Sequence, residues 1–457
     1  MRNRKRCWNH LNLYDYQGIE RHLSAMAAKG WRLEKAGPQL WTYRRAEPAS
    51  VHYAVTYIPD SSQFNPGPTE SQQTLEELCT AAGWEKVCDW YQMQIYVSEA
   101  AKPVPLETDE ALRLEVIHRS MRKNFLPGNA VLLLFSLLMA VLWGKTMVTD
   151  PLRLFRSNAH LFTGPLWILA SALEIVNLGS YWLWRRRSAA SVAEGGRCAV
   201  TGRVSRWANR IAMTCIVLYV AAYLAVELTN PHILPFLATY SAALFLLGFL
   251  MRQTTAFLRR RGTSRKKNMA VTFTMDVILS FALVGGMIFC AIHFDWFGTR
   301  SGETYRFDHF DWDVSPIEIP LEISELTGQT YQHISRTHFE ERSLFLTRHS
   351  YRERVLEGED HLSVSYEITE AGNEWLYGKA VAEYTKEEIA TSWDITWRAV
   401  DPAPWGAETA YQRYMDGNAK AHYVLCYAGR IVEFSLFFRD EAFTETQMRV
   451  VGKELGR

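Results

Sequence analysis

Five long apolar stretches occupy the middle of the chain. Each is about as long as the roughly 20 residues that a helix needs to cross a hydrocarbon layer of about 30 Å. They comprise residues 126–144, 161–184, 211–228, 233–251 and 270–293. A buried soluble core accounts for one or two such stretches, but five in succession predict five transmembrane helices between residues 126 and 293.

A different pattern, repeated twice, precedes these stretches in residues 1–105. In each copy a helical apolar stripe ends at a glycine that a tryptophan follows at once, as Gly30–Trp31 and as Gly83–Trp84. Glycine suits the left-handed position that ends a helix. We therefore expect these four residues to be structural, with each tryptophan anchoring its helix to a sheet in the core. Ligand binding by the tryptophans is the less favoured alternative.

Period-two alternation around the two helices predicts strands. The resulting order is helix, strand, strand, helix, strand, and it leaves open a short additional strand at residues 8–12. Two helices over one antiparallel sheet is the simplest arrangement of these elements. The sequence therefore predicts an α+β domain of ferredoxin-like type over residues 1–105.

Four stretches of this region also carry a family resemblance. They read "LYDYQGIERHLSAMAAKGWRLEKAG", "LWTYRR", "VHYAVTYI" and "AAGWEKVCDWYQMQIYVS". Together they resemble the bacterial DUF2812 family of uncharacterised membrane-associated proteins, over about residues 8–120. The resemblance implies a cytoplasmic module followed by membrane helices. It also implies proximity to PadR-type regulators and so a part in regulated envelope physiology. No catalytic residue is assigned to this family.

Charge is balanced overall, with 50 Lys and Arg against 49 Asp and Glu, but it is segregated along the membrane region. Residues 184–210 and 252–268 each carry seven basic residues, whereas the short loop 229–232 carries none. The positive-inside rule then places the N-terminus in the cytoplasm and the C-terminus outside a bacterial cell membrane. Three basic residues in the first outer loop are a mild exception. We interpret the basic loops as orientation signals that contact anionic lipid rather than nucleic acid.

The regions next to the spans also have recognisable patterns. Residues 106–125 predict a juxtamembrane helix whose basic end lies at the inner lipid surface. Residues 294–457 predict an extracytoplasmic α+β domain, with a strand at 361–369 and a hairpin that turns at Ala428–Gly429. Helices are expected at 370–388 and 444–455. Cys426 is the single cysteine in this region, so it forms no internal disulfide.

Candidate chemistry is sparse. The sequence has none of the common hydrolase, metalloprotease, P-loop or dinucleotide motifs, and we expect no cofactor. Glu174 lies near the middle of the second span, with Ser171 and Asn177 on about the same helical face. A carboxyl group at that depth should face the bundle interior. Asp276 lies closer to the cytoplasmic end of the fifth span. A weaker candidate, for a cation, is the group Asp308, His309, Asp311 and Asp313, although a solvated linker is the favoured interpretation.

Two functions are compatible with this sequence. The favoured hypothesis is a non-enzymatic sensor or regulatory scaffold, which links the outer domain to a cytoplasmic domain that binds a protein partner. It explains two globular regions on opposite sides of a bilayer and the missing motifs. The alternative is a small transporter or membrane enzyme centred on Glu174. Interhelical hydrogen bonding is the favoured role of that carboxyl group.

Overall fold

The computed structural model of the chain describes residues 3–8, 11–37, 40–90, 92–228, 233–293, 303–314, 317–357, 362–389, 394–437 and 443–456. The chain divides into two compact units. The first comprises Met1–Ala140, Leu166–Ala222 and Leu237–Met287. The second comprises Val141–Pro165, Tyr223–Phe236 and Ile288–Arg457. The boundaries between the two units therefore fall within the helical region that connects the N-terminal and C-terminal domains.

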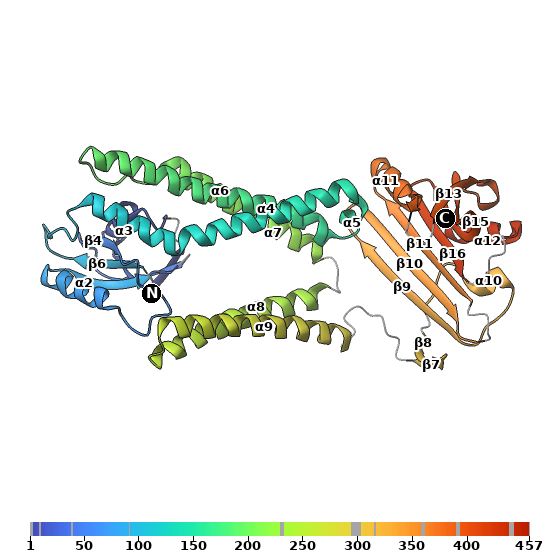
Figure 1. Cartoon of the computed structure of the whole chain (residues 1–457), viewed down its shortest axis with the longest axis horizontal. Helices are drawn as coiled ribbons and strands as arrows, with labels where there is room; N and C mark the ends of the chain where they lie inside the picture. Colours follow the sequence, from blue (N-terminus) through green and yellow to red (C-terminus); the bar gives the residue numbers. More distant parts are fainter. Residues whose placement is uncertain are drawn as a thin grey trace. The chain divides into compact units, whose positions relative to one another are not determined.

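The N-terminal domain, which contains the labelled elements α2, β4 and β6 in Figure 1, consists of two successive repeats of strand, helix, strand and strand. The elements of the first are β1 (Arg4–Trp8), α1 (Tyr16–Ala27), β2 (Trp31–Lys35) and β3 (Leu40–Arg45). Those of the second are β4 (His52–Tyr57), α2 (Glu70–Ala81), β5 (Glu85–Trp90) and β6 (Met93–Ser98). The strands pair in two three-stranded antiparallel sheets, with the equivalent orders β1-β3-β2 and β4-β6-β5. The repeated glycine–tryptophan pair thus marks the same junction, between the helix and the second strand, in both repeats.

This arrangement differs from the expected ferredoxin-like domain, in which two helices cover one sheet. The described strands form two separate sheets, so that prediction is not confirmed. The first sheet includes β1, which begins at Arg4 and not in the stretch 8–12 where a short strand was left open. Its sequence, RKRCW, has no apolar alternation because three of its five side chains are basic and exposed. The two sheets and α1 share one core, which includes Ile19, Leu33, Tyr43 and Ile95.

Local sequence explains how the two helices begin and end. The Asp15 carboxylate accepts a hydrogen bond from the Gly18 backbone N–H at the start of α1. At the start of α2, Thr69 and Gln72 form a capping box. Gly30 and Gly83 follow the two helices with φ of +78° and +79°, the left-handed conformation expected of a terminating glycine.

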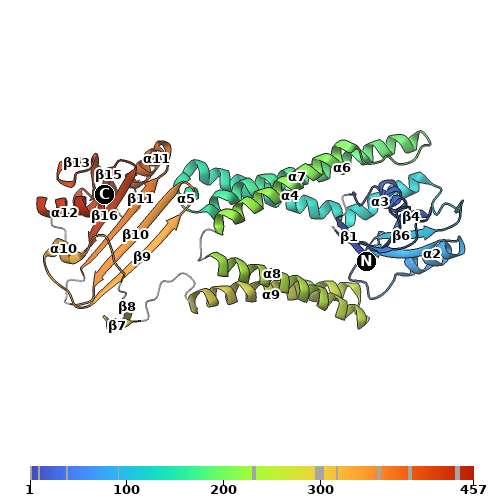
Figure 2. The ribbon, with the colours of Figure 1, turned by 180° about the vertical axis from the view of Figure 1, so that it is seen from behind.

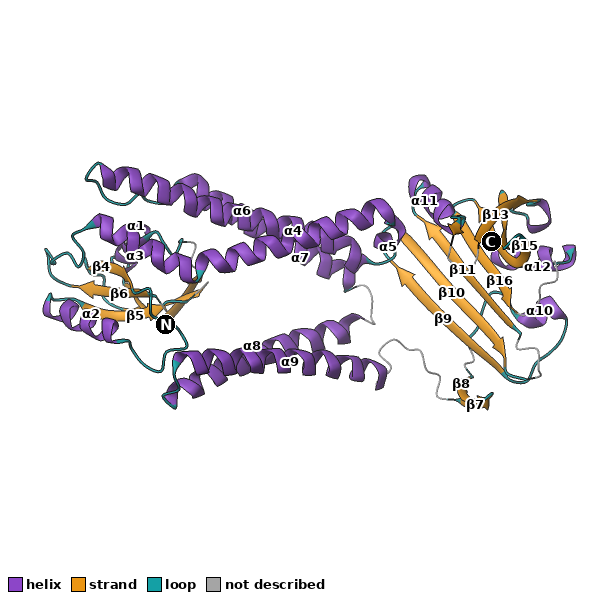
Figure 3. Ribbon diagram, in the orientation of Figure 1, coloured by secondary structure: helices purple, strands orange, loops and turns teal. Residues whose placement is uncertain are grey.

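Five helices of the described chain are long and apolar enough to cross a membrane, as predicted (Figure 3). They are α4 (Phe125–Thr149), α6 (Asn158–Ala193), α7 (Arg203–Glu227), α8 (Ile233–Arg260) and α9 (Arg265–His293). Helix α3 (Glu110–Lys123) precedes α4, and the short helix α5 (Pro151–Phe155) separates α4 from α6. Most of these helices extend well beyond the apolar stretches. The 36 residues of α6 correspond to about 54 Å, which exceeds the thickness of a hydrocarbon layer.

The C-terminal region is an α+β domain, as predicted, and its main sheet has eight strands in the described residues. Their order is β12-β13-β14-β15-β16-β11-β10-β9, and all neighbours are antiparallel (Figure 2). The strands are β9 (Ile334–Arg342), β10 (Leu346–Val355), β11 (Ser363–Ala371), β12 (Glu388–Ile389), β13 (Asp394–Val400), β14 (Thr409–Met415), β15 (Asn418–Tyr427) and β16 (Arg430–Phe437). Gly429 turns the β15–β16 hairpin with φ of +74°.

Helices cover this sheet from two sides. One core holds residues of α10 (Ile323–Thr327) and α12 (Glu445–Leu455) together with Tyr366 and Phe434 of the sheet. A second core holds residues of α11 (Glu374–Tyr384) together with Val424 and Ile431. Leu152 of α5 belongs to this second core. The connection between the first two membrane helices is therefore packed against the C-terminal domain.

Candidate functional site

A buried arginine in α3 organises a polar cluster in the first compact unit, next to the N-terminal domain. Arg113 is only 6 % exposed. Its Nε atom lies 2.8 Å from Oε2 of Glu107, and its Nη1 atom donates a hydrogen bond of 3.3 Å to Oε1 of Glu110. Glu20 of α1 lies slightly farther away, with 3.8 Å between its Oε1 atom and Nη2. The guanidinium also stacks over the Tyr16 ring, 3.8 Å from its centroid. One cation thus faces three carboxyl groups.

The fold brings these groups together at the edge of a sheet. Strand β4 is the outer strand of the order β4-β6-β5, so one side of its backbone has no strand partner in that sheet. The Glu20 carboxylate accepts a hydrogen bond of 2.9 Å from the Val55 N–H, and Arg113 donates one of 3.3 Å to the Val55 carbonyl. Because buried backbone groups need partners, these two side chains stabilise the edge strand while they pair with each other.

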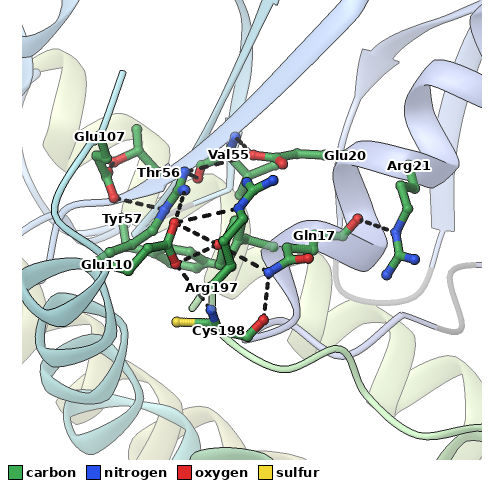
Figure 4. A network of polar contacts seen from close by, with 12 residues as sticks. Gln17, Glu20, Arg21, Val55, Thr56, Tyr57, Glu107, Glu110, Arg197 and Cys198 are labelled. Atoms are coloured by element: carbon green, nitrogen blue, oxygen red, sulfur yellow. Dashed lines mark hydrogen bonds and ion pairs between the residues drawn. The ribbon is translucent and has the colours of Figure 1, made fainter. Parts of the chain in front are cut away.

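Glu110 extends the cluster to the membrane helices. It lies in the first turn of α3, where the Asp109 side chain caps the helix. Its carboxylate accepts hydrogen bonds from the Tyr16 hydroxyl, at 2.8 Å to Oε2, and from the Cys198 backbone N–H, at 3.2 Å. Figure 4 shows Glu110 and Gln17 on either side of Cys198, whose carbonyl accepts a hydrogen bond from the Gln17 amide. Cys198 belongs to the segment 194–202, which we call the α6–α7 connection.

The α6–α7 connection is held from both sides. From the N-terminal domain, the Asp15 carboxylate accepts a hydrogen bond of 3.0 Å from the Thr201 N–H, and Asp15 is only 1 % exposed. From the end of α6, the Trp184 indole donates one of 2.7 Å to the Ala199 carbonyl, and the Ser188 hydroxyl accepts one of 2.9 Å from the Ala199 N–H. Asp15 therefore caps α1 and binds the connection with the same carboxylate.

Aromatic packing reinforces this attachment. The ring of Tyr14, just before α1, lies with its centroid 5.9 Å from that of Phe125 at the start of α4. It lies 5.1 Å from Tyr181 and 5.0 Å from Trp184 of α6. The end of α6 is thus part of the core of the N-terminal domain, which fixes the domain to the ends of two membrane helices.

Burial and charge shift the acid–base equilibria of the cluster in different directions. Burial raises the pKa of Glu20 to about 7, although the Val55 N–H and Arg113 oppose that shift. Burial also acts to raise the pKa of Glu110, but the hydrogen bonds from Tyr16 and Cys198 outweigh it, and the pKa is lowered. Burial would lower the pKa of Arg113, yet the surrounding carboxylates raise it. The raised pKa of Glu20 therefore lies near neutral pH.

The cluster joins α1, α3 and the α6–α7 connection. Burial raises the pKa of the Cys198 thiol to about 12, so the thiol stays protonated and is a poor nucleophile. Within the described residues, no group of three His, Cys, Asp or Glu side chains has the geometry to hold a metal ion. What the geometry can do is transmit a shift of the α6–α7 connection to α1 and α3, and the reverse.

The two predicted tryptophan anchors lie in different environments. Trp84 is 5 % exposed, and its indole donates a hydrogen bond of 2.8 Å to the Val104 carbonyl. Trp31 is only half-buried at the margin of the main core, with the Lys5 ammonium 5.7 Å from its ring centroid. The Gly83 junction therefore places its tryptophan in a core, whereas the Gly30 junction leaves its tryptophan partly open.

The intramembrane candidates lie mostly along α6. Glu174 is 8 % exposed, and its Oε2 atom has no hydrogen-bond partner in the described residues. Asn177 interacts with the Glu174 side chain, one helical turn away. The Ser171 hydroxyl donates a hydrogen bond of 2.8 Å to Ser136 of α4, so the bond between helices is made by Ser171, and interhelical bonding by the Glu174 carboxyl group stays a prediction. Asp276 of α9 is half-buried and does not join this group.

The four weak cation candidates, Asp308, His309, Asp311 and Asp313, lie in a β-hairpin. Strands β7 (Thr304–Phe307) and β8 (Phe310–Asp313) are joined by Asp308 and His309, with φ of 48° and 64°. Two positive φ values in a two-residue loop are typical of a tight hairpin turn. Asp311 and Asp313 lie on β8, and Asp313 pairs with Thr304 across the hairpin. These spacings thus reflect turn and strand geometry.

The residues of the Arg113 cluster were not among the predicted site residues. Its hydrogen bonds join positions that are far apart in sequence, and Glu110 and Cys198 are separated by 88 residues. The one available signal was Arg113 itself. It lies three residues after Glu110 and four before the buried Ile117, within the predicted juxtamembrane helix and on the same helical face as Ile117.

Comparison with known proteins supports the family assignment of this domain. Residues 15–127 match the family described as a protein of unknown function, DUF2812, as the sequence resemblance indicated. The matched range contains the whole Arg113 cluster except the α6–α7 connection. No curated protein and no solved structure matches the chain.

Proposed function

We propose that this chain is a non-enzymatic, multi-pass membrane protein that acts as a sensor or regulatory scaffold. In this role it links an extracytoplasmic C-terminal domain to a cytoplasmic N-terminal domain, which binds a protein partner. The observation that carries the proposal is the attachment of the α6–α7 connection through Asp15, Gln17 and Glu110. A domain bonded to the end of a membrane helix by buried polar groups responds when that helix moves.

The two ends of α6 support the proposed topology. Its first residues lie in the unit of the C-terminal domain, where Asn158 accepts a hydrogen bond of 2.9 Å from the Leu344 N–H. Its last residues lie in the core of the N-terminal domain. A spanning helix exposes its ends on opposite faces of the bilayer, and this supports the proposed arrangement with one domain on each side. The seven basic residues of 184–210, around this end of α6, support a cytoplasmic N-terminal domain.

Complementation of a deletion strain tests this function. Glu110→Ala removes the acceptor for both Tyr16 and Cys198, so we expect loss of complementation at normal membrane insertion. The matched control is Glu115→Ala, which removes an exposed carboxylate from the same helix. The control should complement fully. Full activity of Glu110→Ala at matched expression would contradict the scaffold proposal.

A transporter or membrane enzyme centred on Glu174 is the second candidate. It is favoured by one observation, the buried Oε2 atom without a hydrogen-bond partner in the described residues. In the same assay, Glu174→Gln keeps the size of the side chain but cannot exchange a proton. The scaffold proposal predicts that this variant complements. An inactive but normally inserted Glu174→Gln protein, together with an active Glu110→Ala protein, would instead favour transport.

A further inference from the structure

The first sheet of the N-terminal domain carries a row of arginines on three adjacent strands. Arg44 of β3 pairs directly with Arg4 of β1 on one side and with Arg32 of β2 on the other. Side chains that face each other across antiparallel strands have Cβ atoms about 5 Å apart, and like charges in such positions are destabilising. In the absence of an anion, this row therefore costs stability.

Acidic side chains only partly compensate this charge. Arg4 pairs with Glu34 at 2.5 Å, and Arg32 pairs with Glu99 at 2.7 Å. Arg44, between them, has no ion pair within the described residues. Over the three strands there are seven basic residues and one acidic residue. The sheet thus presents a concentrated positive charge on a protein whose total charge is balanced.

Two open cavities also border this sheet. The larger, of about 1140 Å³, is lined by residues of both faces of the sheet, and the smaller, of about 540 Å³, is lined by Arg4 and Arg44 of the arginine row. The larger cavity is lined by Asn3, Arg4, Lys5, Arg6, Trp31, Glu34, Lys35, Thr42 and Arg45. A hollow lined by guanidinium and ammonium groups suits phosphate oxygens, which accept several hydrogen bonds at once.

Two large apolar side chains continue the arginine face. Alternate residues of a strand point to the same side, so Trp8 follows Arg4 and Arg6 on one face of β1. Its cross-strand partner is Leu40, and the two are 63 % and 44 % exposed. A tryptophan beside basic side chains is typical of surfaces that rest at the boundary between lipid head groups and acyl chains.

The domain is held close to a membrane surface by its own chain. Tyr14 contacts Phe125, which is the first residue of the membrane helix α4. Trp8 precedes Tyr14 by only six residues, a reach of about 20 Å at most. The exposed Trp8 is therefore tethered within about 20 Å of Tyr14, which itself contacts the start of a membrane helix.

We propose that the β1-β3-β2 sheet is a binding surface for anionic phospholipid head groups of the membrane that the helices span. Arg4, Arg44 and Arg32 bind the phosphates, and Trp8 and Leu40 enter the interfacial layer. Binding of lipid by this sheet adds a contact with the membrane to the attachments of the domain at α4 and α6, and this contact depends on the anionic lipid content.

Photo-crosslinking of the full chain in lipid nanodiscs tests this inference. Trp8 is replaced by p-benzoylphenylalanine, which keeps an aromatic ring at the surface. The nanodiscs contain phosphatidylcholine with phosphatidylglycerol as the minor component, and adducts are identified by mass spectrometry. Because each basic side chain at such a surface strengthens association about fivefold, phosphatidylglycerol adducts should exceed its share of the lipid about fivefold or more. The same probe at Leu78, an exposed position on α2, should give no such enrichment.

Charge variants separate lipid binding from a general effect on folding. A double variant with Arg4→Gln and Arg44→Gln should form phosphatidylglycerol adducts only in proportion to the share of this lipid in the nanodisc. A double variant with Arg4→Lys and Arg44→Lys should retain the enrichment of these adducts. High salt should weaken it, since exposed charges are screened. Absence of lipid adducts at Trp8, enrichment that survives the glutamine pair, or crosslinks to copurified nucleic acid or protein in place of lipid would each overturn the inference.

Discussion

Removal of the Arg113 charge is the most informative perturbation of the N-terminal domain. In Arg113→Leu, the carboxyl groups of Glu107 and Glu110 lose the cation that lies 2.8 and 3.3 Å from them. The Val55 carbonyl also loses its donor. Leaving one partner of a buried ion pair uncompensated costs about 3–5 kcal/mol. We expect the domain to lose stability by that amount, because Arg113 is nearly inaccessible to the water that would otherwise screen its partners.

Hydrogen exchange of the full chain in detergent micelles measures this loss. The slowest amides of β4 and β6 report the free energy of opening of the domain. Because about 1.4 kcal/mol corresponds to a factor of ten, their exchange should accelerate by about two to nearly four orders of magnitude.

The matched control is Arg197→Leu. Its Nε atom lies 3.8 Å from Glu110, but its side chain is 65 % exposed, so its contribution should be about 0–1 kcal/mol. Acceleration of less than tenfold in Arg113→Leu, or equal effects of the two variants, would refute the assignment of Arg113 as the organising charge of the cluster.

Three further predictions follow from the same structure. Folding raises the pKa of Glu20 from 4.5 to about 7, so protonation favours the folded state. The contribution of Glu20 to the free energy of unfolding is fully present below pH about 4.5 and is lost as the pH rises through about 7. The difference amounts to about 3 kcal/mol. The free energy of opening, measured by hydrogen exchange from pH 5 to 8, should fall as the pH rises, and Glu20→Gln should abolish this dependence on pH. Trp84→Ala should destabilise the domain by about 3–5 kcal/mol in the same exchange assay. Trp31→Ala should cost less than half as much, and equal losses would contradict the difference in burial. A reporter enzyme that works only outside the cytoplasm should be active when it is fused after Arg457. A reporter signal from the cytoplasm would exclude the proposed topology.

Most of the secondary structure could be predicted from the sequence, because its signals are local. The five spans follow from uninterrupted apolar runs, and the β15–β16 hairpin follows from alternation around Ala428–Gly429. Gly30 and Gly83 end their helices in the left-handed conformation that the sequence pattern predicts. In each case, the residues that determine the element lie within about 20 positions of one another.

Strand pairing and the polar cluster could not be predicted in the same way. The basic strand β1 shows no apolar alternation, so the first sheet was missed as a separate unit. The partners of Arg113 come from α1, β4 and the segment before α3, and those of Glu110 include the distant Cys198. Such contacts depend on the tertiary fold, which the spacing of charged residues along the sequence does not encode. The half-burial of Trp31 is a tertiary effect of the same kind.

Coupling through α6 can be measured directly by exchange at its far end. Leu152→Ala loosens the packing of α5 in the C-terminal core, where Leu152 is 2 % exposed. The matched control is Arg153→Ala, an exposed neighbour on the same short helix. In nanodiscs, we predict faster exchange of the Cys198 and Thr201 amides in Leu152→Ala and no change in Arg153→Ala. Unchanged exchange at both amides in Leu152→Ala, with the C-terminal domain demonstrably loosened, would contradict the proposal that the chain links its two domains.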